Sequence, residues 1–396
     1  MRPIPHEKLD QAVSLLSRFD LDCWLLLGRE TGELCDPSLH LILEPAVTWQ
    51  SAFLITAGGE RVAIVGRYDV HNIELAGGFT RVIGYDADIA VPLRAELARL
   101  QPQRIGLNFS RDNHTSDGLT LGLYLSLLDW LNGTPFRDRL VSADGFASHL
   151  RAVKSPGEVE RVEGAIALAV ELLGQVGGLL RRGMTEQELQ RMMHDRLEQL
   201  GVGTAWDHPY CPVVNFGPDS AIGHAMPGPI PLAPGQVVHL DFGVKRHGYC
   251  SDLQRCWYLA QPGETEPPAE VRRAFDAVAG AIQAAAGYLR PGRTGADVDT
   301  VARRFLTEAG YPEFKHALGH QVGRTAHDGA TLLGPRWPRY GSTVEQPVRE
   351  GEVYTLELGA MTSRGIVSLE EMVVVTADGC RFLAAPQREL WMVTLS

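Results

Sequence analysis

An internal repeat constrains the fold of this chain more than any other feature of its sequence. Residues 180–201 and residues 289–310 follow one pattern: a basic stretch, a turn that contains glycine, a threonine before a helical segment, and a glycine that ends the helix. Arg181 in the first copy corresponds to Arg290 in the second. Helix capping alone can produce this similarity, because many helices begin with threonine followed three residues later by an acidic residue. A true duplication would instead build the fold from two related halves, and the segments that follow each copy can distinguish these interpretations.

The segment after the first copy predicts a β-hairpin with two acidic residues. Two apolar runs, at 237–244 and 249–257, flank a polar stretch at 245–248. If those four residues form the turn, Asp241 lies directly across from Asp252, and both side chains project from the same face of the hairpin.

The segment after the second copy repeats this arrangement. A turn at 362–365 would place Glu357 opposite Glu370. Like charges opposite each other destabilise a sheet, and an unpaired carboxylate is costly to bury in strands as apolar as these. Surface carboxylates on half-exposed strands would explain one hairpin alone, whereas two such hairpins favour a shared pair of divalent cations. A β-bulge could shift either register by one residue.

Histidines accompany both hairpins. His316, His320 and His327 precede the second hairpin, and nearby glycines predict a loop or strand there rather than a continuous helix. His224 occupies the comparable place before the first hairpin. A lone histidine in a loop is usually structural, but several beside four acidic residues favour a functional site. Two histidines of the first hairpin keep the structural interpretation: His239 and His247.

The N-terminal part of the chain has a different pattern. Short apolar runs at 23–27, 52–55 and 62–65 have the length of buried strands, and helical patterns cover 9–19 and 119–131. We therefore predict an α/β domain, and its histidine and aspartate residues show no spacing typical of a metal site.

A domain boundary is predicted near residue 154. Ser155 and Glu158 form a capping-box pattern with proline at the first helical position, followed by a helical segment at 159–180. The predicted domains are therefore residues 1–150 and 151–396.

Composition excludes several classes of protein. The formal net charge is −11 and no basic run stands out, so neither a nucleic-acid partner nor a membrane surface is expected. Uninterrupted apolar stretches such as 165–170 are too short to span a bilayer, and the polar N-terminus does not resemble a secretory signal. Six scattered cysteines without a CxxC pair suggest reduced thiols in the cytoplasm.

Together these segments match a known family. The pattern consists, in chain order, of the junction Leu150–Glu158, Asp-x-Gly at Asp241, Tyr-x-Ser-Asp at Asp252, Gly-His-x-x-Gly at Gly319–Gly323, Thr-x-Glu at Glu357, and Glu370. From Leu150 onwards the chain resembles the pita-bread metallohydrolases, which include methionine aminopeptidase, aminopeptidase P, prolidase and creatinase. The N-terminal part is similar to the creatinase-type domain, and His327-Asp328 is more similar to the prolidase and aminopeptidase P branch.

The resemblance implies a fold and a metal site. It implies an α/β creatinase-type domain followed by an α+β pita-bread catalytic domain with an internal pseudo-two-fold duplication. It also implies two divalent ions, with manganese as the first choice and cobalt or zinc as alternatives. Asp241 and Asp252 would bind one ion, His320 and Glu357 the other, and Asp252 and Glu370 would bridge them.

The resemblance also implies an activity, which is hydrolysis of the peptide bond before proline. Glu357 would act as general acid and base, His224 and His327 would assist catalysis and bind substrate, and His316 would also bind substrate. The compact N-terminal part favours an Xaa-Pro dipeptidase (prolidase) over aminopeptidase P, in a cytoplasmic homodimer acting on peptides with proline second. The alternatives are a creatinase-type hydrolase of a non-peptide C–N bond, which the metal ligands argue against, and a catalytically silent binding module.

Two departures from the family pattern affect substrate preference. Ser368 stands where prolidases often have an arginine that binds the free carboxylate of a dipeptide. Arg364 or Arg324 could supply that charge instead. The insert at 331–341 has no family role, and its two large aromatic residues are expected to pack the loop rather than line a substrate entrance.

Overall fold

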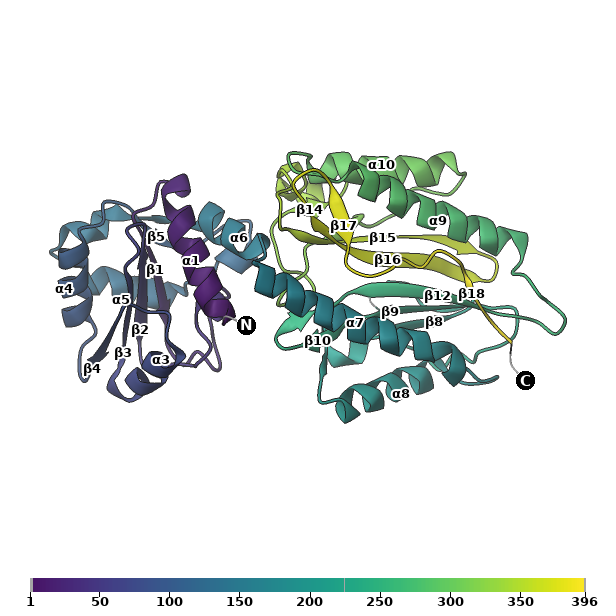
Figure 1. The fold of residues 1–396 in the computed structure, drawn as a ribbon, viewed down its shortest axis with the longest axis horizontal. Helices are drawn as coiled ribbons and strands as arrows, with labels where there is room; N and C mark the ends of the chain where they lie inside the picture. Colours follow the sequence, from purple (N-terminus) through teal and green to yellow (C-terminus); the bar gives the residue numbers. More distant parts are fainter. Residues whose placement is uncertain (1–2, 224, 395–396) are drawn as a thin grey trace. The chain divides into compact units, whose positions relative to one another are not determined.

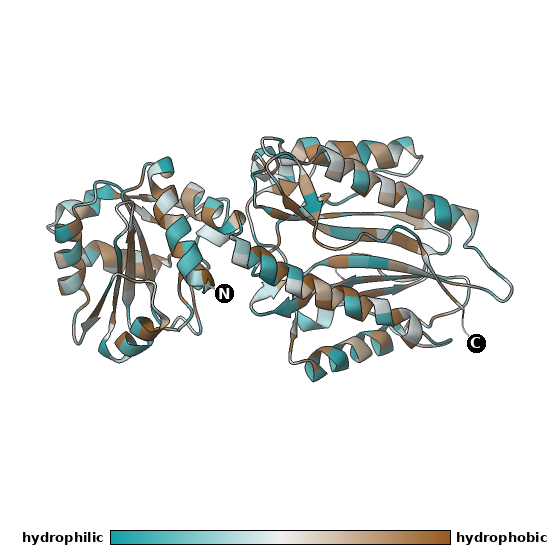
Figure 2. Cartoon of the chain, in the orientation of Figure 1, coloured by the Kyte–Doolittle hydropathy of each residue, from teal (hydrophilic) through white to brown (hydrophobic). Residues whose placement is uncertain are grey.

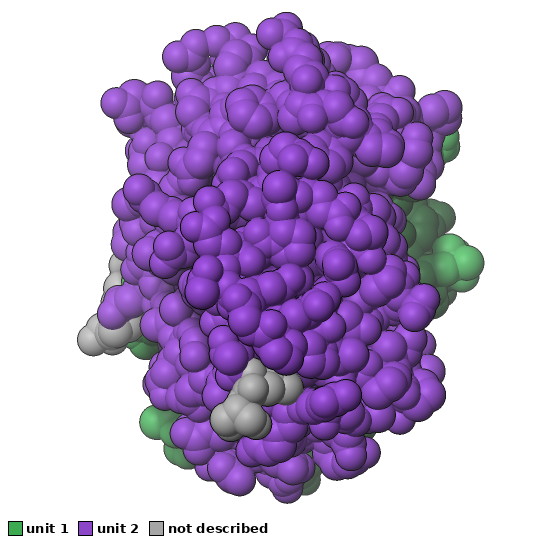
Figure 3. All heavy atoms as spheres, turned by 90° about the vertical axis from the view of Figure 1, so that its right-hand side faces the viewer, with its two compact units in different colours: residues 1–151 green, residues 152–396 purple. Residues whose placement is uncertain are grey.

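The computed structural model describes residues 3–223 and 225–394, which divide into two compact units with the boundary between Arg151 and Ala152. Figure 1 shows the elements of each unit, and Figure 3 colours the first unit green and the second purple. Each unit has its own sheet and its own buried core. The two units are described separately below.

The first unit is a mixed six-stranded sheet in the order β4-β3-β2-β1-β5-β6. Its strands are β1 (Cys23–Gly28), β2 (Ser51–Thr56), β3 (Arg61–Gly66), β4 (Arg81–Tyr85), β5 (Ile105–Leu107) and β6 (Leu140–Ser142). Its helices are α1 (Ile4–Leu16), α2 (Leu39–Ile42), α3 (Val70–Ala76), α4 (Ala90–Leu100), α5 (Leu121–Trp130) and α6 (Asp144–Ala152).

Both faces of this sheet are covered by helices. Side chains alternate along each strand, so neighbouring residues of β1 pack against different helices. Trp24 and Leu26 of β1 belong to one buried cluster with residues of α1, α3 and α6. Leu25 and Leu27 belong to a second cluster with residues of α4 and α5. Burial on both faces explains why these strands read as continuous apolar runs, and it confirms the predicted α/β class.

The second unit is built on a seven-stranded sheet with the path β15-β16-β12-β9-β8, to which β17 and β18 add at β16 and β12. Its strands are β8 (Val213–Phe216), β9 (Val237–Phe242), β12 (Leu253–Leu259), β15 (Val353–Thr362), β16 (Gly365–Val375), β17 (Cys380–Phe382) and β18 (Trp391–Val393). Smaller strands outside this sheet are β7 (Gly203–Thr204), β10 (Val244–Arg246), β11 (Tyr249–Cys250), β13 (Gly319–His320) and β14 (Leu332–Leu333).

Two pairs of helices pack on this unit's strands (Figure 1). The first pair is α7 (Pro156–Leu179) and α8 (Glu186–Gln199), which contact β10–β12 and β8 respectively. The second pair is α9 (Ala269–Tyr288) and α10 (Gly295–Glu308), of which α9 lies on β15 and β16. Figure 2 shows hydrophobic and hydrophilic residues on the same helices, as expected when one face is buried.

The two helix pairs confirm the repeat seen in the sequence. The Ser155 capping box starts α7 as predicted, and Thr185 and Thr294 cap α8 and α10. The repeated turns also have the same backbone contacts: the Gly183 N–H donates to a carbonyl oxygen at 2.8 Å, and the Gly292 N–H does so at 2.9 Å. Capping chemistry alone would not reproduce these long-range contacts, so the similarity reflects a structural duplication.

The predicted register of the first hairpin is wrong by two residues. Asp241 pairs with Gln254, not with Asp252. The cause is the turn: Arg246 pairs with Tyr249, so the loop has only two residues, His247 and Gly248, rather than four. Both have positive φ, 49° and 77°, as a type I′ hairpin turn requires. A shift of two residues keeps every side chain on the same face, so Asp252 still shares a face with Asp241.

The second hairpin has the predicted register. Glu357 of β15 pairs directly with Glu370 of β16, and Thr362 pairs with Gly365 at the turn. Leu356 and Leu369, which neighbour the two glutamates, belong to the buried cluster that includes α9. Because side chains alternate along a strand, Glu357 and Glu370 project from the face that α9 does not cover.

The helix α7 is long and apolar enough, by length and composition, to cross a membrane. Such a helix is also common in the core of a folded domain. The contacts of α7 with β10–β12 and the complete burial of Val162, Ala165 and Ala169 account for its apolar character.

The aromatic residues of the insert at 331–341 pack within the loop, as expected. The rings of Trp337 and Tyr340 stack with centroids 5.9 Å apart, and the Arg339 guanidinium lies over both rings. The Arg303 guanidinium of α10 also faces Trp337. The insert is therefore held on α10 by cation–π contacts.

Candidate metal centre and active site

A cavity of about 560 Å³ opens over the face of the sheet that carries the paired acidic residues. Four of its lining residues are the carboxylates predicted from the two hairpins, and two more are predicted histidines. The lining consists of Trp206, Asp207, Tyr210, Val213, Asp241, Asp252, His320, Ala326, His327, Glu357 and Glu370. The sequence repeat thus brings its two acidic hairpins to one cavity.

The four carboxylates come from β15, β16 and β9 and from the start of β12, the strand between β16 and β9. Glu357 and Glu370 face each other on β15 and β16. Asp241 lies on β9, and Asp252 lies just before β12, where its backbone N–H is 3.1 Å from the Met372 sulfur. Asp252 and Glu370 are almost fully buried, whereas Glu357 keeps 22% of its side chain exposed.

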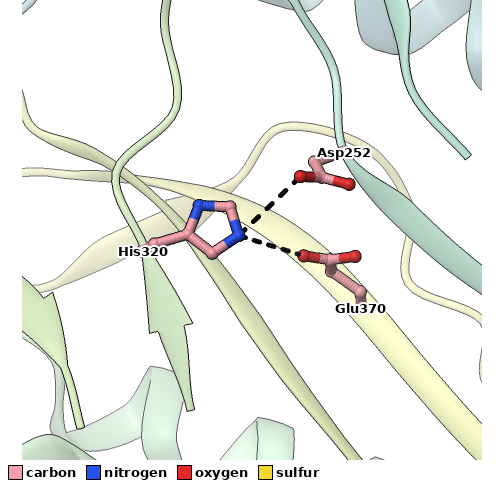
Figure 4. Close-up of side chains that lie close together, drawn as sticks. All are labelled: Asp252, His320 and Glu370. Atoms are coloured by element: carbon pink, nitrogen blue, oxygen red, sulfur yellow. Dashed lines mark ion pairs between the residues drawn. The ribbon is translucent and has the colours of Figure 1, made fainter. Parts of the chain in front are cut away.

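The strand β13 brings His320 to these carboxylates. The His320 Nε2 atom lies 3.7 Å from Asp252 Oδ2, 3.7 Å from Glu357 Oε1 and 4.0 Å from Glu370 Oε1. Figure 4 shows the imidazole pointing at Asp252 and Glu370. Its backbone N–H donates to Thr355 Oγ1 at 3.1 Å, which ties the histidine to β15.

Glycine at position 319 permits this close approach. A Cβ atom on Gly319 would lie 1.9 Å from the Thr355 carbonyl oxygen, which is far below van der Waals contact. The glycine before His320 is therefore required by packing against β15, and not only by the loop conformation. This explains the Gly-His pair noted in the sequence.

Burial raises the pKa of all four carboxyl groups, and the charges of acidic neighbours raise it further for three of them, Asp252, Glu357 and Glu370. Loss of hydration on burial is the largest cause in each case. Four such groups in one cavity are stable only if they share protons or bind cations.

The donor set fits divalent cations. Asp252, His320 and Glu370 each place one ligand atom within 4.8 Å of the other two. Asp241 Oδ1 is buried and has no hydrogen-bond partner among the described residues, as expected for an oxygen meant for a cation. Oxygen-rich sites with one imidazole suit manganese, cobalt and zinc.

The other histidines predicted to act in the site do not all lie in the cavity. His327 is exposed at the cavity wall, and its ring lies 4.1 Å from that of His320. His316 is exposed, with its ring 5.5 Å from the Phe314 ring, and it is not among the described residues that line the cavity. His224 lies outside the described residues.

Other predicted residues lie away from the cavity. The structural interpretation of His239 fits its burial, and His247 forms the first hairpin turn. Ser368 is buried, and its hydroxyl group donates to Gln254 Oε1 at 2.6 Å, with the Leu358 carbonyl oxygen 3.1 Å from the same Oγ atom. Neither Arg324 nor Arg364 belongs to the described cavity lining.

Sequence reasoning did not identify one wall of the cavity. Trp206, Asp207 and Tyr210 come from the loop between β7 and β8, far from both hairpins in sequence. Their proximity arises because Val213, at the start of β8, pairs with Asp241. The only signal in the sequence was the concentration of aromatic residues before β8.

Comparison with known proteins identifies the family of this chain. The model of metallopeptidase family M24 matches residues 160–377. An uncharacterised peptidase of Staphylococcus saprophyticus is 29% identical over 353 residues, covering 88% of this chain and 89% of that protein. An Xaa-Pro dipeptidase of Pyrococcus furiosus is 27% identical over 327 residues, covering 80% of this chain and 89% of that protein.

Solved structures share the fold over nearly the whole chain. An X-Pro aminopeptidase from Thermotoga maritima superposes with a TM-score of 0.77 at 24% identity, covering 97% of this chain and all of that one. An Xaa-Pro dipeptidase from Bacillus anthracis superposes with a TM-score of 0.75 at 21% identity, covering 98% and 100%. These matches confirm the pita-bread fold. The chain belongs to metallopeptidase family M24.

Proposed function

We propose that this protein is a two-metal peptidase that hydrolyses the peptide bond before proline. The observation that carries the proposal is the convergence of Asp252, Glu357 and Glu370 on His320 Nε2, with the unpartnered Asp241 Oδ1 in the same cavity. The Xaa-Pro peptidases among its relatives and structural neighbours support the substrate class.

The proposed ligands divide between two ions. Asp241 and Asp252 would hold one ion, His320 and Glu357 would hold the other, and Asp252 and Glu370 would be shared by both. Two divalent ions in such a site lower the pKa of a water molecule and polarise the scissile carbonyl group. Manganese is the proposed metal because oxygen ligands dominate, with cobalt or zinc as alternatives.

The protein groups then handle protons and substrate. Glu357 takes the proton of the attacking water and returns it to the leaving nitrogen; its carboxylate is 22% exposed and therefore accessible from the cavity. His327 contacts the substrate from the cavity wall, and we propose related binding roles for His224 and His316. The protein is proposed to act as a cytoplasmic homodimer.

The residues that line the cavity bear on whether the substrate is a dipeptide or a longer peptide. A dipeptidase must neutralise the free carboxylate of the proline residue, and the described lining contains no lysine or arginine. Ser368, where prolidases often carry arginine, is turned into a buried network. These observations favour aminopeptidase P activity as the second candidate beside the Xaa-Pro dipeptidase favoured by the sequence.

The test compares hydrolysis of Ala-Pro and Ala-Pro-Ala by manganese-loaded protein, with Ala-Ala-Ala as the control peptide. Cleavage of Ala-Pro alone identifies a dipeptidase, and efficient cleavage of Ala-Pro-Ala identifies aminopeptidase P. If manganese binds but neither proline peptide is cleaved, the proposed substrate class is wrong.

A variant tests the site itself. Asp252→Asn should abolish both manganese binding and peptide cleavage, because this carboxylate is proposed to contact both ions. Asp276→Asn, which changes an exposed carboxylate on α9, is the matched control and should leave both unchanged. Unchanged turnover in Asp252→Asn would overturn the site assignment.

A further inference from the structure

A buried glutamine occupies the centre of the acidic cluster. Gln254 lies on β12, the strand of the first hairpin that adjoins the second hairpin, where it pairs with Asp241 on one side and with Glu370 on the other. Its side chain is 5% exposed. Because it follows Asp252 by two residues, it projects from the same face of the sheet.

The amide nitrogen of Gln254 contacts both glutamates of the second hairpin. It donates to Glu357 Oε2 at 3.0 Å and to Glu370 Oε2 at 3.2 Å, which uses both of its N–H groups. The other oxygen of each glutamate, Oε1, is the one that faces His320 Nε2. Gln254 therefore binds one oxygen of each carboxylate. The second oxygen of each stays directed towards His320 Nε2.

The orientation of this amide is fixed by a second set of contacts. Gln254 Oε1 accepts a hydrogen bond from Ser368 Oγ at 2.6 Å and lies 3.0 Å from His239 Nε2. With its oxygen held on that side, the amide must direct its nitrogen towards the carboxylates. With both glutamates ionised, as cation binding requires, the reverse orientation would place an acceptor against two acceptors, which is unfavourable in a buried site.

The contacts continue to the loop before the first hairpin. His239 Nδ1 lies 2.9 Å from Asn215 Oδ1, and the Asn215 amide nitrogen donates to the Ala221 carbonyl oxygen at 2.8 Å. His239, Asn215 and Gln254 are all buried. Burial lowers the pKa of His239 to about 4, so the ring is neutral and can donate to only one of the two oxygen atoms beside it, Asn215 Oδ1 or Gln254 Oε1.

We propose that Gln254 is a positioning residue that orients Glu357 and Glu370 for metal binding, with the Ser368 hydroxyl group fixing the direction of its amide. The proposal rests on the proposed two-metal function. It assigns a role to Ser368, the position at which the chain departs from the prolidase pattern.

The test replaces Gln254 by methionine, which keeps the length of the side chain but removes both N–H donors. Groups that orient metal ligands typically change metal affinity or activity 10- to 100-fold when they are replaced. We expect Gln254→Met to weaken Co²⁺ binding by this factor and to alter the visible absorption of the bound Co²⁺. We also expect it to lower kcat by a larger factor than it changes KM. Ser368→Ala should change the Co²⁺ absorption spectrum in the same way but by a smaller amount.

The matched control is a second buried glutamine beside the same strand. Gln387 exchanges hydrogen bonds with the backbone of Cys256 on β12 and does not line the cavity in the described structure. Gln387→Met should lower the melting temperature but leave the Co²⁺ spectrum and affinity unchanged. This comparison separates loss of a buried hydrogen bond from loss of ligand orientation.

The outcomes also separate this inference from the proposed function. If wild-type protein binds Co²⁺ and Gln254→Met binds it with the same affinity and spectrum, the positioning role is wrong while the metal site stands. If wild-type protein binds no Co²⁺, the two-metal function is itself wrong. Equal spectral changes in Gln254→Met and Gln387→Met would also contradict the inference, because the effect would then be structural.

Discussion

At the scale of single residues, the alternation of side chains along β16 gives two adjacent glutamates opposite surroundings. Glu370 projects into the acidic cavity. Glu371 projects to the other face, where its carboxylate pairs with Arg255 Nη2 at 3.0 Å and accepts the Gln387 backbone N–H at 2.9 Å. One carboxylate has like charges as neighbours and the other has a cation, although both are buried.

This contrast predicts opposite effects for the same chemical change. Glu370→Gln should stabilise the metal-free protein, by roughly 1 kcal/mol, because it removes a charge that repels its neighbours. It should also abolish manganese binding. Glu371→Gln should destabilise the protein by about 3–5 kcal/mol, because it leaves the Arg255 charge unpaired in the core. Urea unfolding of the metal-free variants measures both effects, and a stability loss in Glu370→Gln as large as that in Glu371→Gln would contradict this account.

The sequence predicted these residues unevenly. The four carboxylates followed from apolar strands that carry charge at matching positions, and the resemblance selected His320 among several histidines. Gln254 was missed because a polar residue two positions after Asp252 is unremarkable in a half-buried strand. Only the register, which pairs Gln254 with both Asp241 and Glu370, shows that it is central.

At the scale of elements, the turn of the first hairpin shows what the sequence did not specify. A four-residue turn and a two-residue turn both fit the run Lys245–Gly248. The positive φ of His247 selects the shorter one, and residues other than glycine are uncommon in that conformation. The second hairpin was predicted in register because each strand end could be located from uninterrupted apolar runs.

The turn itself is testable. Gly248→Ala should destabilise the protein by about 1–2 kcal/mol, because alanine is disfavoured at a φ of 77°. Space is not limiting, since a Cβ atom there would lie 3.6 Å from the nearest side chain, Arg324. Gly174→Ala, at an exposed site in α7, is the control and should stabilise the helix by about 0.5–1 kcal/mol. A neutral Gly248→Ala in thermal unfolding would show that the turn is not a constraint.

At the scale of the whole molecule, the repeat explains why the site exists. Each half supplies one helix pair and one acidic hairpin, and neither hairpin alone brings four carboxylates together. The repeat and the α/β class of the first unit could be predicted because capping residues and strand lengths are local signals, whereas the pita-bread fold was implied by the resemblance to a known family. The cavity wall formed by Trp206, Asp207 and Tyr210 could not, because it depends on the pairing of β8 with β9.

The cluster also predicts how stability depends on pH. Burial raises the pKa of Asp241 to about 7 and that of Glu357 to about 8, above the value near 4 expected in the unfolded chain. Between these values the folded metal-free protein holds more protons than the unfolded chain. Its stability therefore falls as pH rises from about 4 to about 8. A bound cation replaces those protons, so metal should stabilise the protein increasingly over the same interval.

The most direct test of the central claim, that these carboxylates are arranged for cations, is the melting temperature of metal-free and manganese-loaded protein from pH 5 to pH 8. We predict that the difference between the two forms grows steadily with pH, and that Asp252→Asn removes it. A manganese effect that is absent in wild-type protein, or that has the same size at every pH, would contradict the account.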